Sequence, residues 1–414
     1  MKEKKLNRRS FFKLSGLVAG VFAIFGFFKL TKDDIFAQKN SPSKALSQSI
    51  SKGTIKIDEK KSNVYLSAAQ KDMNIEESVR QAVEAVTNFN WLKMGQTVFI
   101  KPVLNSGLSY PATTNPIAIA AMIKLLKQKG AGKVIVGDMS GVEHLRFFKD
   151  KTTGSTRDLM KKSGMMQAIE EAGGEPWFFE EGGWDSFYKD HTDTKGFWDN
   201  GLMMPAILKN VDHIVLMPRC SSHVLSGASL GLKAVVGYWR TDTRLQYHYY
   251  ADSFHERTAE GNRVKTLLDK QRLVISTGDK LLATFGPDKG YIHTPSAGLV
   301  IASESIVAHD MVSLAWLLYN RKLLPAEEQD TFMDTSTSIA KLANTLVVKL
   351  LGTWGNSLTS ETLLKNDLKS IWDDRVLNHA YKIFGGLPDI HLENVQSTVP
   401  EKIMKTLHKM TQYS

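Results

Sequence analysis

Charged, amide and histidine side chains follow several apolar runs of this sequence, at points where short buried strands are expected to end. Lys101 and Asn105 close one run, Asp138 closes the next, and Arg219 and His223 follow a third. In an open parallel sheet, ligands bind at the carboxyl ends of the strands, so these side chains are expected to lie together. Lys101 and Arg219 would bind a carboxylate or phosphate. Asp138 and His223 would act as acid and base or as metal ligands.

A predicted helix start would add to this anion site. Thr114 and Asn115 precede Pro116, and an asparagine cap followed by a first-turn proline is typical of a helix N-terminus. The free backbone N–H groups and the helix dipole there favour an anion. Lys233 would contribute a further positive charge. A structural alternative stays open, because Asn115 is fully explained as a cap and loops are polar for solvation alone.

Histidines and acids suggest a metal site as a second kind of chemistry. Asp310 is the candidate ligand, since it stands beside His309 in an apolar helical pattern and a buried carboxylate costs free energy unless it is paired. The alternative is that the histidines are solvated or hydrogen-bonded, because no pair has a recognised metal spacing. The remaining candidates for a His/carboxylate site are Asp138, His213, His223, His248 and His255.

The cysteine content excludes several kinds of cofactor. Cys220 is the single cysteine, so one chain acting alone has no disulfide, iron–sulfur cluster or cysteine-ligated zinc site. Glycine-rich nucleotide-binding loops of the G-x-G-x-x-G and Walker types are also missing from the sequence. We therefore expect no iron–sulfur cluster, and the cofactor, if any, stays open.

The apolar periodicity predicts the elements that would hold these residues. Alternation of strands with helices indicates an α/β fold with a mainly parallel sheet flanked by helices. We assign residues 63–320 to this domain and 321–414 to a helical C-terminal region, which shows helical spacing at 339–350 and no convincing strand. Strands are expected at 63–66, 97–100, 133–137, 177–179, 213–217, 273–276 and 299–302, and helices at 75–86, 116–129, 158–172 and 306–318.

The N-terminus predicts the location of the protein. Arg8 and Arg9 are followed by Ser-Phe-Phe-Lys and an apolar run, which matches a twin-arginine export signal over residues 1–37. We expect export in the folded state through the twin-arginine translocase to the periplasm. The alternative is an uncleaved segment 1–37 that anchors the protein to the inner membrane, which would be its only membrane contact. Residues 38–62 are predicted to form a polar tether.

The charge pattern argues against nucleic-acid binding. The formal net charge is +10, and the signal segment carries half of it, with eight Lys/Arg against three Asp/Glu. The remaining excess is spread along the chain without the clustered basic stripe that binds phosphate backbones. The expected partners are therefore the translocase, a small anion or a divalent metal.

Three ordered blocks carry a resemblance to a known family. They run from Thr97 to Asp138, from Asp212 to Gly237 and from Gly286 to Asp310. Together they resemble the domain-of-unknown-function family 362 over roughly residues 63–318. The resemblance implies a shared fold and shared positions, since the family has no agreed reaction. Many relatives carry ferredoxin-like cysteine clusters, which this chain lacks.

The middle block differs from the family pattern. Relatives show a second lysine before a Thr-His pair where this sequence has Ser221, Ser222 and His223, and an asparagine where it has Ala234. Arg219 stands where the family implies a lysine. These differences allow a different ligand preference.

Two functions follow from these observations. The first is an exported protein that binds a small anion, a metal or both at the strand ends, with or without enzymatic activity. The second is a non-catalytic envelope protein that assists a redox or cell-surface complex through its C-terminal helices.

Overall fold

The central element is an eight-stranded sheet in the order β16-β1-β15-β12-β9-β2-β3-β6. The computed structural model describes residues 57–69, 74–223, 225–284, 286–325, 328 and 368–413. β15 runs antiparallel to both of its neighbours, and the other neighbouring strands are parallel. The mainly parallel sheet is therefore confirmed. The strands are β1 (Ile57–Ala69), β2 (Thr97–Pro102), β3 (Lys133–Asp138), β6 (Glu175–Phe178), β9 (His213–Met217), β12 (Gln271–Gly278), β15 (Gly298–Ser303) and β16 (Leu387–Asn394).

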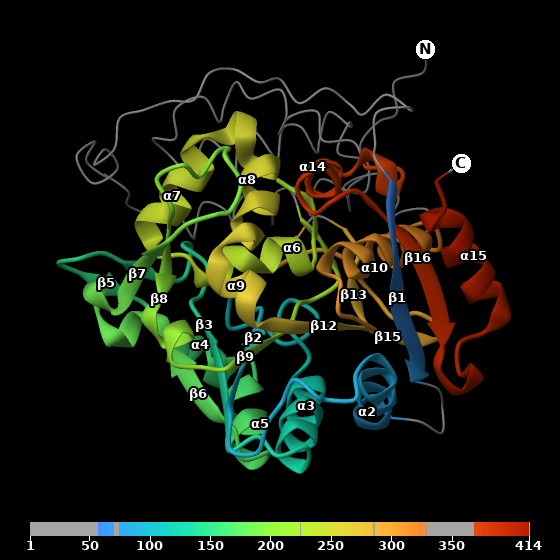
Figure 1. The fold of residues 1–414 in the computed structure, drawn as a ribbon, viewed down its shortest axis with the longest axis horizontal. Helices are drawn as coiled ribbons and strands as arrows, with labels where there is room; N and C mark the ends of the chain where they lie inside the picture. The colour runs from blue at the N-terminus through green and yellow to red at the C-terminus, as the bar shows by residue number, and fades with distance from the viewer. Residues whose placement is uncertain are drawn as a thin grey trace, which may run out of the picture.

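Helices cover both faces of this sheet (Figure 1). Side chains alternate between the two faces of a strand, so β15 sends Leu299 and Ile301 into one hydrophobic cluster and Val300 and Ala302 into another. Both clusters are buried, which explains why this strand reads as a continuous apolar run. The helices are α2 (Ile75–Val86), α3 (Pro116–Gln128), α4 (Thr156–Lys162), α5 (Met165–Glu171), α6 (Gly231–Ala234), α7 (Thr241–Tyr249), α8 (Phe254–Glu260), α9 (Lys265–Lys270), α10 (Ile306–Arg321), α14 (Arg375–Ile383) and α15 (Glu401–Thr411).

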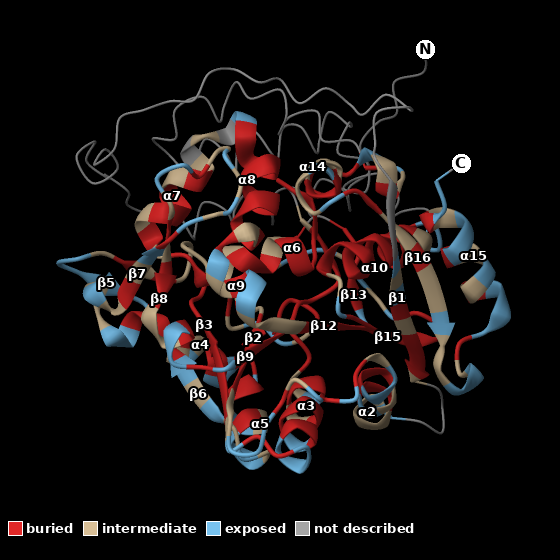
Figure 2. Cartoon of the chain, in the orientation of Figure 1, coloured by how far each residue is buried: buried red, intermediate tan, exposed pale blue. Residues whose placement is uncertain are grey.

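Each face has its own set of covering helices. α2, α3 and α5 pack with the cluster that contains Val300, and α10, α14 and α15 pack with the cluster that contains Leu299. Phe99 of β2 enters a third cluster with Tyr247 of α7 and Phe254 of α8. Figure 2 shows the resulting layers, with buried residues in the sheet and exposed residues on the outer surfaces of α3, α5 and α15.

A small second sheet is formed by four short strands between residues 221 and 293. Its order is β11-β10-β13-β14. β10 (Ser221–His223) and β11 (Gly227–Ser229) form a hairpin that continues the chain from β9, and β13 (Leu281–Leu282) and β14 (Ile292–His293) follow β12. This hairpin carries the chain from the end of β9 into α6.

The C-terminal region contains helices, α14 and α15, as the fold prediction expected, and it also contains a strand that sequence analysis missed. β16 pairs in parallel with β1, with Val64 opposite Leu392. Figure 1 shows the two strands side by side. The predicted division at residue 320 therefore cuts through one sheet. Pro388 weakens the strand signal, and proline is tolerated here because β16 is an edge strand.

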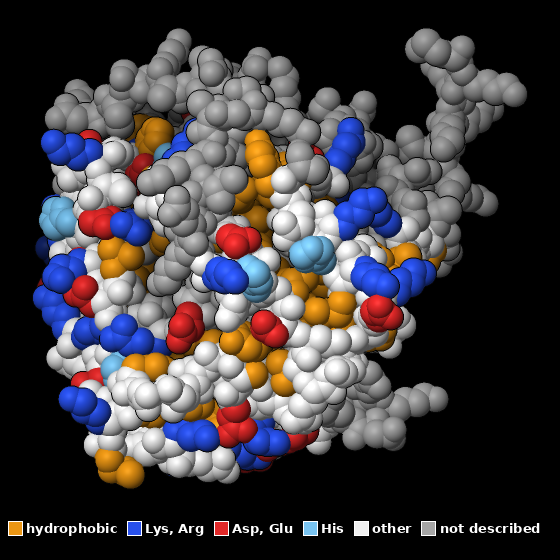
Figure 3. All heavy atoms as spheres, turned by 45° about the vertical axis from the view of Figure 1, so that its right-hand side comes forward, with side chains coloured by type: hydrophobic (Ala, Val, Ile, Leu, Met, Phe, Trp, Pro, Cys, Tyr) orange, Lys and Arg blue, Asp and Glu red, His pale blue; other side chains and the backbone are white. Residues whose placement is uncertain are grey.

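The predicted tether also ends earlier than expected, because residues 57–62 belong to β1. The export signal, the rest of the tether and the predicted helix at 339–350 lie outside the described residues. Among the described residues, no helix is long and apolar enough to cross a membrane. On the face drawn in Figure 3, basic and acidic side chains are interspersed.

Candidate anion-binding site

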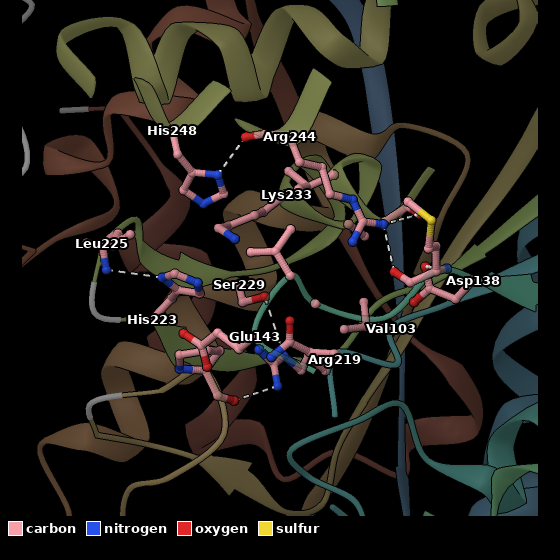
Figure 4. A pocket seen from close by; sticks show the side chains of 18 of the residues that line it. Val103, Asp138, Glu143, Arg219, His223, Leu225, Ser229, Lys233, Arg244 and His248 are labelled. Carbon is pink, nitrogen blue, oxygen red and sulfur yellow. Dashed lines mark hydrogen bonds between the residues drawn. The ribbon is translucent and has the colours of Figure 1, made fainter. Parts of the chain in front are cut away.

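A cavity of about 120 Å³ lies at the carboxyl ends of β9, β2 and β3. These strands are neighbours in the sheet, and all three are parallel. The loop after β3, the β10–β11 hairpin, α6 and α7 complete its walls (Figure 4). Six of the nine predicted site residues line this cavity, namely Lys101, Asn105, Asp138, Arg219, His223 and Lys233.

Lys101 and Asp138 form a buried ion pair at the floor of the site. The Lys101 ammonium lies 2.8 Å from Oδ1 of Asp138, and the two side chains are 0% and 4% exposed. Burial lowers the pKa of Lys101, and Asp138 opposes that effect. The backbone N–H of Met139 donates to Oδ1 of Asp138 at 2.8 Å, and that of Leu104 donates to Oδ2 at 2.7 Å. Both carboxylate oxygens are engaged, so the structure favours an anchoring role for Asp138 over the predicted acid–base role.

Gly237 makes room for this ion pair. A Cβ at this position would lie 2.3 Å from Oδ1 of Asp138 and 2.4 Å from Nζ of Lys101. Real Cβ atoms do not approach other heavy atoms so closely, so a side chain here would displace the ion pair. Glycine is therefore required by the close approach of η5 (Val235–Tyr238) to the strand ends.

Two arginines bring positive charge to the cavity while donating only to backbone or hydroxyl oxygens. Arg219 donates to the carbonyls of Ala112 and Pro287 and to the Ser229 hydroxyl. Its Nη2 group has no hydrogen-bond partner among the described residues. Burial lowers the pKa of Arg219 to about 10, and Asp288 opposes that effect. The guanidinium remains charged at neutral pH.

Arg244 of α7 holds the loop after β3 in place. Its guanidinium donates to the carbonyls of Trp239, Ser140, Met139 and Gly237 at 2.5–2.8 Å. Burial lowers its pKa to about 10. Neither Arg244 nor Arg219 forms an ion pair with a carboxylate of the described chain.

Lys233 projects into the cavity from α6, between His223 and His248 (Figure 4). It is only partly exposed, and its ammonium has no hydrogen bond or ion pair with any described residue. Burial lowers the pKa of Lys233 to about 7, and the charges of Arg219 and Arg244 lower it further. At neutral pH this lysine is therefore present as both ammonium and amine.

Asp310 does not reach the cavity, so its predicted role as a metal ligand is not supported. It is 2% exposed, and its two carboxylate oxygens accept the backbone N–H groups of Gly231 and Leu232 at 2.8 and 2.7 Å. Nδ1 of His309 lies 2.9 Å from Oδ1. A carboxylate that caps the first turn of α6 is stabilised there. Asp310 therefore acts by positioning α6 and, with it, Lys233.

Thr114 and Asn115 also lie outside the cavity lining. Thr114 accepts the backbone N–H of Val103 at 2.8 Å and donates to the carbonyl of Met217 at 2.6 Å, which ties the loop after β2 to the end of β9. Asn115 caps α3 by accepting the N–H of Ile117. The cap prediction is confirmed, and the ligand-binding roles of both residues are replaced by structural ones.

The two cavity histidines carry their protons on different nitrogens. Nδ1 of His223 lies 3.1 Å from the backbone N–H of Leu225, which can only donate. The neutral ring therefore carries its proton on Nε2, as a donor. Nδ1 of His248 lies 2.7 Å from the carbonyl of Arg244, so its proton is on Nδ1 and the lone pair is on Nε2.

Both rings are neutral at physiological pH. Burial lowers the pKa of His223 well below its usual value, with help from Lys233 and Arg219. Burial likewise lowers the pKa of His248 to about 3. A neutral His223 with Nε2–H is a hydrogen-bond donor toward an anion, and not the base that sequence analysis allowed.

Glu143, His144 and Asp288 form a cluster at the rim that sequence analysis missed. Their ligand atoms lie within 4.8 Å of one another, a spacing that could hold a metal ion. Oδ2 of Asp288 lies 3.0 Å from Nε2 of His144, and Asn105 donates to Oδ1 at 2.8 Å. Burial, followed by the charge of Asp288, raises the pKa of Glu143 to about 6. Glu143 and His144 follow β3, so the strand-end rule that selected Asp138 could have selected them.

Cys220 is buried away from the cavity. Its Sγ donates to the carbonyl of Ser313 at 3.3 Å, and the residue is 1% exposed. Burial raises the pKa of the thiol, so a reactive thiolate is not formed near neutral pH.

A family model described as "Domain of unknown function (DUF362)" matches residues 98–315, which is more than half of the 414-residue chain. The chain belongs to this family. Every residue that lines the cavity falls within the DUF362 match. β1 and β16 complete the sheet from outside the DUF362 match.

Other comparisons give partial similarity only. The lactate racemase apoprotein from Thermoanaerobacterium thermosaccharolyticum is 12% identical, with a TM-score of 0.33 over 54% of this chain and 51% of its own. A Thermotoga maritima protein from a structural genomics consortium is 14% identical, with a TM-score of 0.33 over 50% of each chain. The DUF362 chain thus spans about half the length of each structure. No curated protein matches the sequence.

Proposed function

We propose that this protein binds a small carboxylate or phosphate in the cavity at the strand ends. The supporting observation is a set of three cations that face one cavity without an ion-pair partner among the described residues: Arg219, Lys233 and Arg244. Asp138 neutralises the fourth cation, Lys101. The remaining carboxylate of the lining is Glu143, whose raised pKa of about 6 leaves it partly protonated near neutral pH.

The magnitude of the attraction between these cations and a bound anion supports the proposal of an anionic ligand. A unit charge about 4 Å from a monoanion contributes roughly 4 kcal/mol at an effective dielectric constant of about 20, before desolvation is counted. His223 adds a neutral N–H donor, and the Nη2 group of Arg219 adds a charged one. The site therefore offers charge and directed donors to an anion of two or three oxygens.

Isothermal titration calorimetry with oxalate and phosphate tests this function, with neutral acetamide as the uncharged probe. We expect both anions to bind at pH 6 and acetamide not to bind. Lys233→Met removes a charge without removing any hydrogen bond, and it should weaken oxalate binding by roughly tenfold or more, since charge-assisted bonds contribute about 1.5–3 kcal/mol.

The matched control for the titration is Lys265→Met, which removes an exposed lysine that does not line the cavity. Oxalate affinity should be unchanged in this variant. The proposal fails if neither anion binds at millimolar concentration, or if the control loses as much affinity as Lys233→Met.

Within the part of the chain that the structure describes, the proposal places a divalent metal at Glu143, His144 and Asp288. One imidazole and two carboxylates suit a borderline cation such as Zn²⁺ or Mn²⁺. Titration with Mn²⁺ checks this site: binding that His144→Ala abolishes supports it, and equal binding by the variant rejects it.

We further propose that Arg8 and Arg9 direct export of the folded protein to the periplasm. The support is the motif itself, which lies outside the described residues. Replacing both arginines with lysine should leave the protein in the cytoplasmic fraction when the cell is fractionated. The alternative function as an accessory protein depends on the segment after Pro325, and residues 329–367 also lie outside the described residues.

A further inference from the structure

We infer that Lys233 is a nucleophilic amine that forms an imine with the carbonyl group of a small 2-oxo carboxylate bound in the cavity. The inference rests on the proposed function, because the carboxylate group must first bind beside the amine. It also extends that function, since it names the substrate class and gives one cavity residue a covalent role.

The first support is the lack of a partner for Lys233. Lys101 has the carboxylate of Asp138, and the guanidinium groups of Arg219 and Arg244 have carbonyl oxygens. The Lys233 ammonium has no acceptor among the described residues, although it is only partly exposed. A lysine that served only to fill space would gain from an acceptor or from solvent. A lysine ammonium that has no acceptor and lies near other cations loses its proton more easily, and the free amine is a nucleophile.

The second support is the fixed position of this lysine. α6 is capped by both oxygens of Asp310, and Asn262 donates to the carbonyl of Leu232 at 2.8 Å. Gly231 allows this cap, since a Cβ there would lie 2.7 Å from Oδ1 of Asp310. The amine is thus carried by a short element that is held from both sides, as an attacking group must be.

The surrounding charges then set its protonation. Arg219 and Arg244 oppose the ammonium, and the two neutral histidines do not stabilise it as a carboxylate would. With a pKa of about 7, roughly half of Lys233 is free amine at neutral pH, against about one in 2,500 for an ordinary lysine. The titratable and charged groups that line the cavity with it are Lys101, Asp138, Glu143, Arg219, His223, Arg244 and His248.

The substrate class follows from the combination of an amine with an anion site. The carboxylate of a 2-oxo acid would accept from Nη2 of Arg219 and Nε2 of His223, which places the adjacent carbonyl carbon toward the amine. The Lys233 lone pair forms a C–N bond, and the carbonyl oxygen takes up a proton. The nitrogen then loses its remaining protons as the oxygen leaves as water. The two protons of the Lys233 amine thus leave with the carbonyl oxygen as water, and a C=N bond replaces the C=O bond.

Reductive trapping tests the imine. The full chain is treated with glyoxylate, the smallest 2-oxo carboxylate, in the presence of cyanoborohydride, and intact mass and peptide mapping locate the product. We expect one carboxymethyl group, on Lys233, and labelling that rises between pH 6 and 8 as the amine is freed. Exposed Lys265 should be labelled at least about tenfold more slowly, because its ammonium keeps its proton.

Two variants separate the chemistry from the charge. Lys233→Arg keeps a cation that cannot form an imine, so it should lose the adduct. Lys265→Arg is the matched control, and it should keep the adduct on Lys233. The imine is overturned, with the proposed function intact, if oxalate binds through Lys233 but glyoxylate labels the variant Lys233→Arg as strongly as the native chain. Absence of both oxalate binding and labelling overturns both.

Discussion

Replacement of Lys101 by methionine should reveal how strongly the buried ion pair supports the site. The variant leaves the Asp138 carboxylate without its cation, at a position where both side chains are at most 4% exposed. Breaking a buried pair by removing one partner costs about 3–5 kcal/mol. Two backbone N–H groups still bind Asp138, so we expect a loss near the lower end, about 3 kcal/mol.

A surface ion pair of similar length provides the comparison. Lys133 lies 2.6 Å from Glu175, but the two side chains are 43% and 55% exposed. Exposed pairs contribute about 1 kcal/mol or less, so Lys133→Met should have little effect. Each variant removes the lysine of one ion pair. The difference in their loss of stability therefore measures the effect of burial and not the presence of an ion pair.

Urea unfolding monitored by tryptophan fluorescence provides the assay. Lys101→Met, Lys133→Met, Asp138→Asn and the double variant Lys101→Met/Asp138→Asn are measured at low and high salt. The double variant should recover part of the loss, because no unpaired charge remains. High salt should change the free energy of unfolding of the native chain and of Lys101→Met by similar amounts, because salt screens buried charges little. A Lys101→Met loss no larger than that of Lys133→Met would refute the reasoning.

Three further predictions concern residues around the cavity. Asp310→Ala leaves two N–H groups of α6 without an acceptor, so it should lower the free energy of unfolding by about 1–3 kcal/mol and weaken oxalate binding; unchanged binding would reject its positioning role. Lys233→Met should stabilise the protein at pH 6, because the folded state disfavours the Lys233 ammonium, whose pKa is about 7. This gain in stability should shrink between about pH 7 and 10. Thermal unfolding measured against pH checks the prediction, and a gain that grows with pH contradicts it. Cys220 should resist iodoacetamide until urea unfolds the chain, and rapid alkylation of the native protein would show that the thiol is accessible.

Local signals in the sequence determined the elements and one edge of the site. Apolar runs fixed β2, β3 and β9, and Asn115 with Pro116 fixed the start of α3, because strand burial and helix capping depend on neighbouring residues. The strand-end rule then brought Lys101, Asp138 and Arg219 together without any structure, since parallel strands share one carboxyl edge.

Contacts distant in the sequence were beyond such reasoning. In β16 the buried Leu387 and Ile390 stand three residues apart, a spacing that also suits a helix, and only pairing with β1 makes the segment a strand. The roles of individual side chains had the same dependence. In the sequence, Asp310 has no evident partner for its carboxylate. The partner is the backbone of α6, 79 residues away, whose Gly231 N–H donates to Oδ1. The proton positions on His223 and His248 follow from the backbone groups that contact Nδ1 of each ring.

The sequence therefore determined which residue types stand at the strand ends, and the tertiary structure decided which of them face the cavity and in which chemical state. Periodicity and capping report local conformation, whereas pairing of β1 with β16 and the environment of Lys233 depend on which segments meet in space. Burial and neighbouring charge set the pKa of a group, and neither is encoded in its own stretch of sequence.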